Sequence, residues 1–247
     1  MPVADASAFL QGVRGAIGAT RRRGDGATRR EGESQFQVQA MRQRAAAQWQ
    51  ELWQRFADGL NAVGGQGHRA AHLDEAAGVV ARLAGEGAGR KIVTWDLAAL
   101  GFGAVPDALR GRGLEVVTAS PSRAELADPA VRARLRTQLA EAGLGITGAD
   151  YAVAETGTLL LISGEGRSRL VSLLPRIHVA LIRKEHLVPA MRDMQAILEV
   201  EHREGRALDA SCLNFITGPS RSADIEFVLA RGVHGPGEVH VILVAEQ

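Results

Sequence analysis

The feature that most constrains the fold is an alternation of two kinds of segment in the middle of this 247-residue chain. Residues 91–95 and 114–118 are apolar and rich in valine and threonine, whereas residues 106–112 and 124–142 are rich in helix-forming residues. Strands that alternate with helices form a mostly parallel sheet with helices on its faces. The sequence therefore predicts an α/β fold built on an open, mostly parallel sheet with flanking helices.

Polar turns divide the C-terminal half of the chain into further elements of the same kinds. Residues 151–155 and 158–162 are extended pieces separated by Thr156 and Gly157, a pattern typical of a hairpin or a bulged strand. Glu155 is then expected at the bend. The remaining expected elements are strands at residues 177–183, 213–217 and 239–244, and a helix at residues 189–204.

The N-terminal quarter is organised differently. Residues 21–34 are rich in arginine and glycine and almost lack aliphatic side chains, which is typical of a flexible linker. Residues 36–63 carry one broad apolar stripe, which predicts a long amphipathic helix. We therefore expect two parts, a helical extension with its linker at residues 1–66 and an α/β domain at residues 67–247.

Composition argues against several classes of function. The formal net charge is +1, with 29 basic and 28 acidic residues, so the chain has no overall field that would attract nucleic acid. A single cysteine, Cys212, excludes a disulfide within the chain and a set of thiolates for an iron–sulfur cluster. His68 and His72 have helical ligand spacing but no third ligand nearby, so we expect no metal site. No apolar run is long enough for a membrane span, and we expect a cytoplasmic protein.

The polar segment at residues 218–237 lies between two apolar runs and reads as a loop, a helix and a glycine-rich turn. Where a strand turns into a helix, free backbone N–H groups, the Ser220 hydroxyl and the Arg221 guanidinium would converge, as an anion site requires. The alternative is a capped helix, with Ser220 or Ser222 as the N-cap and Asp224 placed to suit the helix dipole. Taken alone, the segment favours capping.

Four segments of the C-terminal half resemble the LUD-domain family, and within it the lactate-utilization C proteins. They occur in the family's order and spacing, and the resemblance covers about residues 145–244. The segments are residues 150–161, 172–180, 218–226 and 232–236. The resemblance implies a fold similar to the NagB/RpiA/CoA-transferase-like group, with the site at the ends of the strands.

The resemblance also implies a function. Members of this family act with two partner proteins in the oxidation of L-lactate to pyruvate, and these partners carry cysteine-rich iron–sulfur motifs. This chain is then expected to be the cluster-free, non-redox subunit, with no cofactor of its own and with a small anionic ligand. Two alternatives stay open: an independent enzyme of the sugar-phosphate isomerase, CoA-transferase or folate-ligase type, and a regulatory module that senses a carboxylate or a phosphate.

Candidate site residues follow from these segments. Glu155, Asp224 and His234 are candidates for proton transfer, and Arg221 is the candidate anion-binding cation because a guanidinium binds carboxylate or phosphate through two hydrogen bonds. Segment 164–169 is polar and basic and is expected to form a loop beside the pocket. The full set of expected ligand-binding residues is Thr156, Gly157, Thr158, Gly218, Ser220, Arg221 and Gly235.

Overall fold

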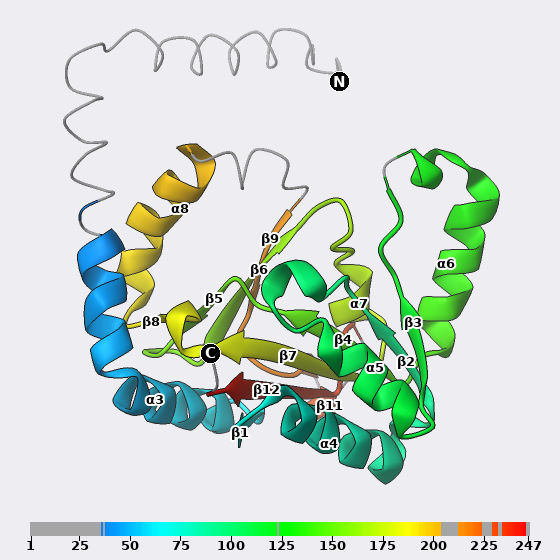
Figure 1. Cartoon of the computed structure of the whole chain (residues 1–247), viewed down its shortest axis with the longest axis horizontal. Coiled ribbons are helices and arrows are strands. Elements are labelled where there is room, and N and C mark those ends of the chain that lie inside the picture. The colour runs from blue at the N-terminus through cyan, green and yellow to red at the C-terminus, as the bar shows by residue number, and fades with distance from the viewer. Residues whose placement is uncertain are drawn as a thin grey trace, which may run out of the picture.

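The computed structural model describes residues 36, 38–122, 124–203, 212–223, 229–231 and 234–245. Its centre is a six-stranded sheet with the order β1-β12-β7-β4-β2-β3, in which every neighbouring pair is parallel. This arrangement confirms the expected open, parallel α/β fold (Figure 1). The strands are β1 (Gln66–Ala70), β2 (Lys91–Thr94), β3 (Glu115–Thr118), β4 (Leu144–Gly148), β7 (Ile177–Arg183) and β12 (Glu238–Val244).

Helices cover both faces of this sheet, and the core lies between the layers. The side chains of β4, β7 and β12 are almost all buried, as expected for parallel strands that are covered on both faces. In Figure 1, α3 and α4 lie below the sheet and α6 and α7 lie above it. The helices are α3 (Trp49–Ala62), α4 (Leu73–Leu83), α5 (Ala104–Gly111), α6 (Pro129–Glu141), α7 (Leu170–Leu173) and α8 (Met194–Arg203).

A second sheet of four strands lies beside the first, in the order β8-β5-β6-β9. Its central hairpin confirms the extended pair expected around Thr156 and Gly157, because β5 and β6 are antiparallel neighbours. Helical residues 38–47 and α8 cover this sheet and form a second apolar cluster with it. The strands are β5 (Tyr151–Val153), β6 (Thr158–Ser163), β8 (Leu187–Val188) and β9 (Cys212–Ile216).

The expected long helix at residues 36–63 is interrupted. The chain bends at Gln48, and helical residues 38–47 and α3 then pack in different places. The first piece contributes Val38 and Met41 to the second apolar cluster and Ala45 to the main core, to which α3 contributes Phe56 and Leu60. The bend divides one apolar stripe between two cores. The boundary expected after residue 66 stays a prediction, and residues 1–35 lie outside the described residues.

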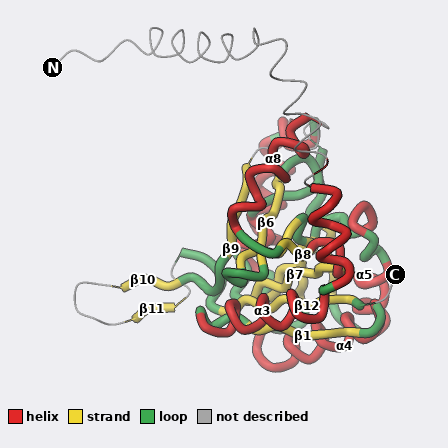
Figure 2. The backbone as a smooth tube through the Cα atoms, turned by 90° about the vertical axis from the view of Figure 1, so that its left-hand side faces the viewer, coloured by secondary structure: helices red, strands yellow, loops and turns green. Residues whose placement is uncertain are grey.

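The helix expected within residues 218–237 is wrong at residues 221–223 and 229–231, which the structure describes. These residues form strands β10 (Arg221–Ala223) and β11 (Leu229–Arg231), which pair antiparallel and project from the body in Figure 2. Antiparallel pairing between the two strands satisfies backbone N–H and C=O groups that a helix would have satisfied internally. Asp224 lies outside the described residues.

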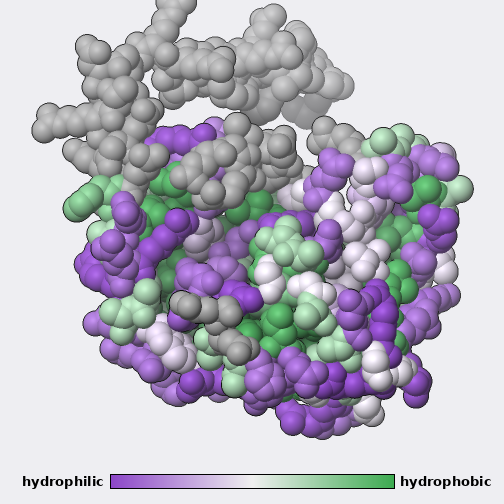
Figure 3. Space-filling view, in the orientation of Figure 1, coloured by the Kyte–Doolittle hydropathy of each residue, from purple (hydrophilic) through white to green (hydrophobic). Residues whose placement is uncertain are grey.

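In Figure 3, the lower rim, formed by α3 and α4, is mostly hydrophilic. Among the described residues, no helix is both long enough and apolar enough to cross a membrane.

Candidate functional site

A cavity of about 560 Å³ opens at the carboxyl ends of the central strands. We call it the edge cavity. Asp150 lies just after β4, and Glu185 and His186 lie just after β7, so both strands end at its wall. Open α/β sheets bind their ligands outside the carboxyl ends of the strands, and the volume is that of a small-molecule site. Its charged and polar wall residues include Arg42, Asp150, Tyr151, Arg167, His186 and Glu201.

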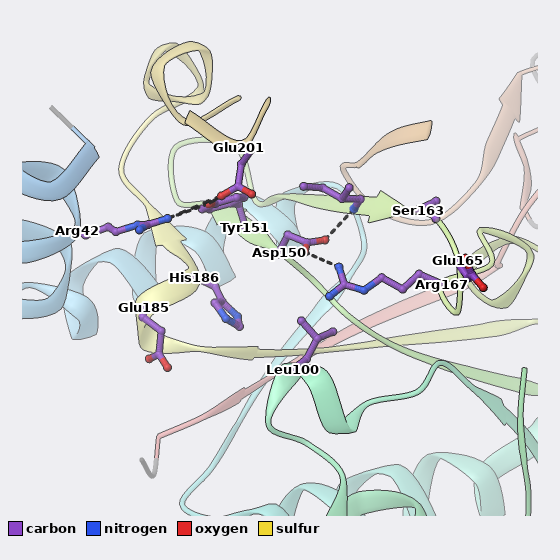
Figure 4. Close-up of a pocket in the computed structure, with 12 residues that line it drawn as sticks. Arg42, Leu100, Asp150, Tyr151, Ser163, Glu165, Arg167, Glu185, His186 and Glu201 are labelled. Carbon is purple, nitrogen blue, oxygen red and sulfur yellow. Dashed lines mark hydrogen bonds and ion pairs between the residues drawn. The ribbon is translucent and has the colours of Figure 1, made fainter. Parts of the chain in front are cut away.

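Three residues from separate segments meet on one side of the edge cavity (Figure 4). The Tyr151 hydroxyl, on β5, donates a hydrogen bond to Glu201 Oε1, on α8. Arg42 Nη2 donates to the same hydroxyl at 3.1 Å and lies 3.8 Å from Glu201 Oε1. Glu201 is only 3% exposed, so its carboxylate depends on these partners, since an unpaired buried charge is costly.

A second pair, Asp150 and Arg167, forms another part of the wall. Arg167 Nη1 donates to Asp150 Oδ1 at 2.7 Å, and the backbone N–H of Ile162 donates to Asp150 Oδ2 at 2.7 Å. The Arg167 guanidinium also lies over the Trp95 ring, 5.7 Å from its centroid. Both oxygens of the carboxylate are therefore occupied, and the arginine is held between the aspartate and the indole.

His186 is held in a defined tautomer. The backbone N–H of Arg183 donates to His186 Nδ1 at 3.2 Å, so Nδ1 acts as an acceptor and, in the neutral ring, the proton is on Nε2. Burial lowers the pKa of His186, although Glu185 and Asp150 oppose this effect. The lowered pKa favours the neutral ring. In Figure 4 the ring extends into the cavity. His186 therefore offers an N–H donor without a full charge.

The balance of charges and hydrogen-bond donors indicates what the edge cavity accepts. Arg42 and Arg167 balance the two buried or half-buried carboxylates, and both of these carboxylates already accept hydrogen bonds. The remaining acids, Glu165 and Glu185, are exposed at the rim. Among the described lining residues, four carboxylates outnumber two arginines, and the N–H donors that can bond a ligand acceptor are those of Arg42, Arg167 and His186. The described residues contain no group of three or more potential metal ligands.

The only tyrosine in the chain is Tyr151, so its ionisation can be followed by absorbance. Burial, followed by the hydrogen bond to Glu201, raises the pKa of Tyr151 to about 12. In an alkaline titration of the folded protein we expect tyrosinate absorbance to appear about two pH units above its usual range. The unfolded protein should titrate near pH 10. A folded-state midpoint near pH 10, with circular dichroism unchanged, would contradict the buried contact.

The structure places one group of the expected site residues at the packing contact between the β5–β6 turn and α3. Thr156 Oγ1 donates to Thr158 Oγ1 at 2.7 Å, and Thr158 Oγ1 lies 3.0 Å from Thr217 Oγ1. Gly157 has a φ of 65°, and a Cβ there would overlap the backbone nitrogen of Leu60. The close backbone approach that Gly157 permits is therefore an approach to α3.

Glu155 lies at the same turn but faces a different neighbour. Its Oε2 accepts the backbone N–H of Met191 at 2.9 Å, and the side chain is exposed. His234 is also exposed. Glu155 and His234 do not line the edge cavity, and Asp224 lies outside the described residues, so the structure does not assemble the three proton-transfer candidates there.

The remaining expected residues lie on the side of the sheet opposite the edge cavity, near the amino ends of the strands. Arg221 donates to the carbonyl of Val63, and the Ser220 N–H donates to the carbonyl of Pro236 at 2.8 Å. Gly235 lines a second cavity, of about 860 Å³, at the amino ends of β4, β7 and β12. Gly218, with a φ of 134°, packs against the Val63 side chain.

Sequence reasoning assigned no site role to several residues of the edge cavity. Arg42, His186 and Glu201 lie in segments with no local motif, so no sequence signal identified them. Asp150 and Tyr151 begin the first of the four segments that resemble the LUD-domain family, so the resemblance could have indicated their place in the site. The expected polar loop at residues 164–169 does border a pocket, because Gly164, Glu165 and Arg167 line the edge cavity.

Comparison with known proteins identifies relatives of this chain. It is 47% identical over 114 residues to "Lactate utilization protein C" of Halalkalibacterium halodurans, covering 46% of this chain and 49% of that protein. The protein of that name from Bacillus subtilis is 42% identical over 107 residues, covering 43% of this chain and 44% of that one. The alignments thus span about half the length of these curated relatives.

A solved structure supports the fold. The crystal structure of a DUF162 family protein from Deinococcus radiodurans matches with a TM-score of 0.52 at 24% identity, covering 79% of this chain and 98% of that one. A sequence model of the LUD domain matches residues 53–244, which is well over half of the chain. The chain therefore belongs to the LUD-domain family.

Proposed function

We propose that this protein acts in lactate utilization as a non-redox subunit of an L-lactate-oxidising system. The observation that carries the proposal is the similarity of about half the chain to proteins named for lactate utilization. The oxidation of lactate to pyruvate removes two electrons, and a chain with one cysteine lacks the thiolates for an iron–sulfur cluster. As the resemblance to the LUD-domain family implies, the proposal includes two partner proteins that carry cysteine-rich iron–sulfur motifs.

The role proposed for this subunit is to bind an anionic ligand. The edge cavity supports this role because its wall offers donors from Arg42, Arg167 and His186. The loop with Ser220 and Arg221 remains a second proposed anion site, since Arg221 is exposed and has further N–H groups besides the one bonded to Val63.

Deleting the gene tests the role in lactate utilization. We expect the deletion strain to grow poorly on L-lactate and normally on pyruvate, because pyruvate is the product of the proposed step. Expression of the wild-type chain from a plasmid should restore growth on L-lactate. Normal growth on L-lactate, in a host without another lactate-oxidising enzyme, would refute the proposal, and poor growth on both carbon sources would place the defect elsewhere.

A further inference from the structure

We propose that the edge cavity binds a monocarboxylate with a bulky apolar body, of the class of branched or aromatic 2-hydroxy and 2-oxo acids. This inference rests on the proposed binding of an anionic ligand and specifies the class of that ligand. Three properties of the cavity carry it: the donors in its wall, its volume and its apolar surface.

The donors indicate a carboxylate. Arg42 has one terminal nitrogen bonded to Tyr151, and its side chain is 46% exposed, so other N–H groups of the guanidinium remain accessible. His186 presents Nε2–H, because Nδ1 accepts the Arg183 amide. A guanidinium and a neutral imidazole N–H together donate hydrogen bonds to the oxygens of a carboxylate.

The charge balance favours one carboxylate over two. Within the wall, Arg42 and Arg167 match Glu201 and Asp150. The additional charges are those of Glu165 and Glu185 at the rim, and both are negative. Among the described lining residues four carboxylates face two arginines, so each negative charge on a ligand adds repulsion, and a ligand with one carboxylate meets less of it than a ligand with two.

The volume indicates a ligand larger than lactate. Lactate has six non-hydrogen atoms and displaces at most about 180 Å³ if each occupies the ~30 Å³ of a water molecule in the liquid. The cavity measures about 560 Å³. Lactate would leave most of this space to water, whereas a ligand with a phenyl or branched alkyl group would occupy much more of it.

The apolar surface indicates what fills the remaining space. Leu100 and Ile162 line the cavity, and Figure 4 shows the Leu100 side chain between His186 and Arg167. Small-molecule sites combine a mostly apolar wall with a few placed polar groups that orient the ligand. Burying an aromatic or branched group against such a wall strengthens binding by about ten- to a hundredfold over a methyl group.

Calorimetric titration of the full-length protein tests this inference. The probes are L-lactate, L-3-phenyllactate, its neutral alcohol analogue 3-phenylpropane-1,2-diol and the dicarboxylate succinate. We expect phenyllactate to bind at least tenfold more tightly than lactate, and the alcohol and succinate to bind at least tenfold more weakly than phenyllactate. Equal or tighter binding of lactate or succinate would overturn the proposed ligand class.

Single substitutions locate the site. Arg42→Gln and His186→Asn should each weaken phenyllactate binding by about tenfold or more, because the shorter amide side chain does not place its N–H where the guanidinium or the imidazole Nε2–H lies. Leu100→Trp should reduce the affinity for phenyllactate and spare that for lactate, because it narrows the apolar part. The matched control is Arg110→Gln, on the exposed surface of α5, where the arginine pairs with Asp107; it should change nothing.

The outcomes separate this inference from the proposed function. If lactate binds through Arg42 and His186 but phenyllactate binds no better, the ligand class is wrong and anion binding in the edge cavity stands. If Arg221→Gln abolishes binding and Arg42→Gln does not, the ligand site is near the second cavity and the inference is overturned. If no probe binds, both the inference and the anion-binding role fail, whereas growth on L-lactate independently tests the role in lactate utilization.

Discussion

Gly157→Ala should lower the free energy of unfolding by about 3 kcal/mol or more. Gly157 has a φ of 65°, which costs an alanine about 1–2 kcal/mol. The added methyl group would also overlap the backbone of Leu60 on α3, and overpacking of this kind costs about 1–3 kcal/mol more. Because a helix backbone yields less easily than a side chain, we expect α3 to be displaced from the main core.

Denaturant unfolding measures this effect, with Gly78→Ala as the matched control. Gly78 lies within α4, and a Cβ there meets no atom within 4 Å. The control should therefore stabilise the protein by about 0.5–1 kcal/mol, because alanine favours helix more than glycine does. Equal stability of Gly157→Ala and the wild type would show that the β5–β6 turn does not pack against α3 as described.

Acidification from pH 7 to pH 5 should remove about 2 kcal/mol of stability through His178 alone. This histidine is fully buried on β7, and its Nε2 lies 2.8 Å from Thr147 Oγ1. Burial, followed by the proximity of His240, lowers the pKa of His178 to about 3. The folded protein then keeps the ring neutral, whereas the unfolded chain protonates it below about pH 6.5.

The folded protein loses stability on acidification because the unfolded chain binds a proton at His178 that the folded protein does not. The contribution of His178 to the free energy of unfolding is complete above about pH 6.5. It is lost as the pH falls toward 3, at about 1.4 kcal/mol per pH unit. Burial also lowers the pKa of His68, to about 4, and that of His240, so these two residues act in the same direction. His68 Nε2 lies 3.0 Å from His240 Nδ1, and protonating both rings would place two positive charges side by side.

Unfolding free energies at pH 7 and pH 5 measure the effect. His178→Gln should reduce the pH dependence, because glutamine does not titrate and retains a group able to bond Thr147. His202→Gln, at an exposed position of α8, should preserve the pH dependence of the wild type. An unchanged pH dependence in His178→Gln would show that His178 is not the group responsible.

Local sequence patterns determined the elements of this fold. The apolar, β-branched runs became buried parallel strands, and α4 spans Leu73–Leu83, where alanine, valine and leucine recur with a helical period. The Thr156–Gly157 pair correctly marked the turn between β5 and β6. These features were readable because hydrophobic periodicity and turn residues act over a few neighbouring positions. The structure of residues 218–237 could not be read in this way, because their pattern suits either a capped helix or a paired hairpin.

Only the tertiary structure decided which side chains form the edge cavity. Arg42 and Tyr151 are 109 positions apart in the chain, yet they share a hydrogen bond beside Glu201. Their meeting depends on the bend at Gln48 and on the packing of α8 over the second sheet. The same packing directs Gly157 toward α3 instead of toward a ligand. Local patterns do not encode such contacts, because they arise from the burial of apolar faces that are distant in sequence.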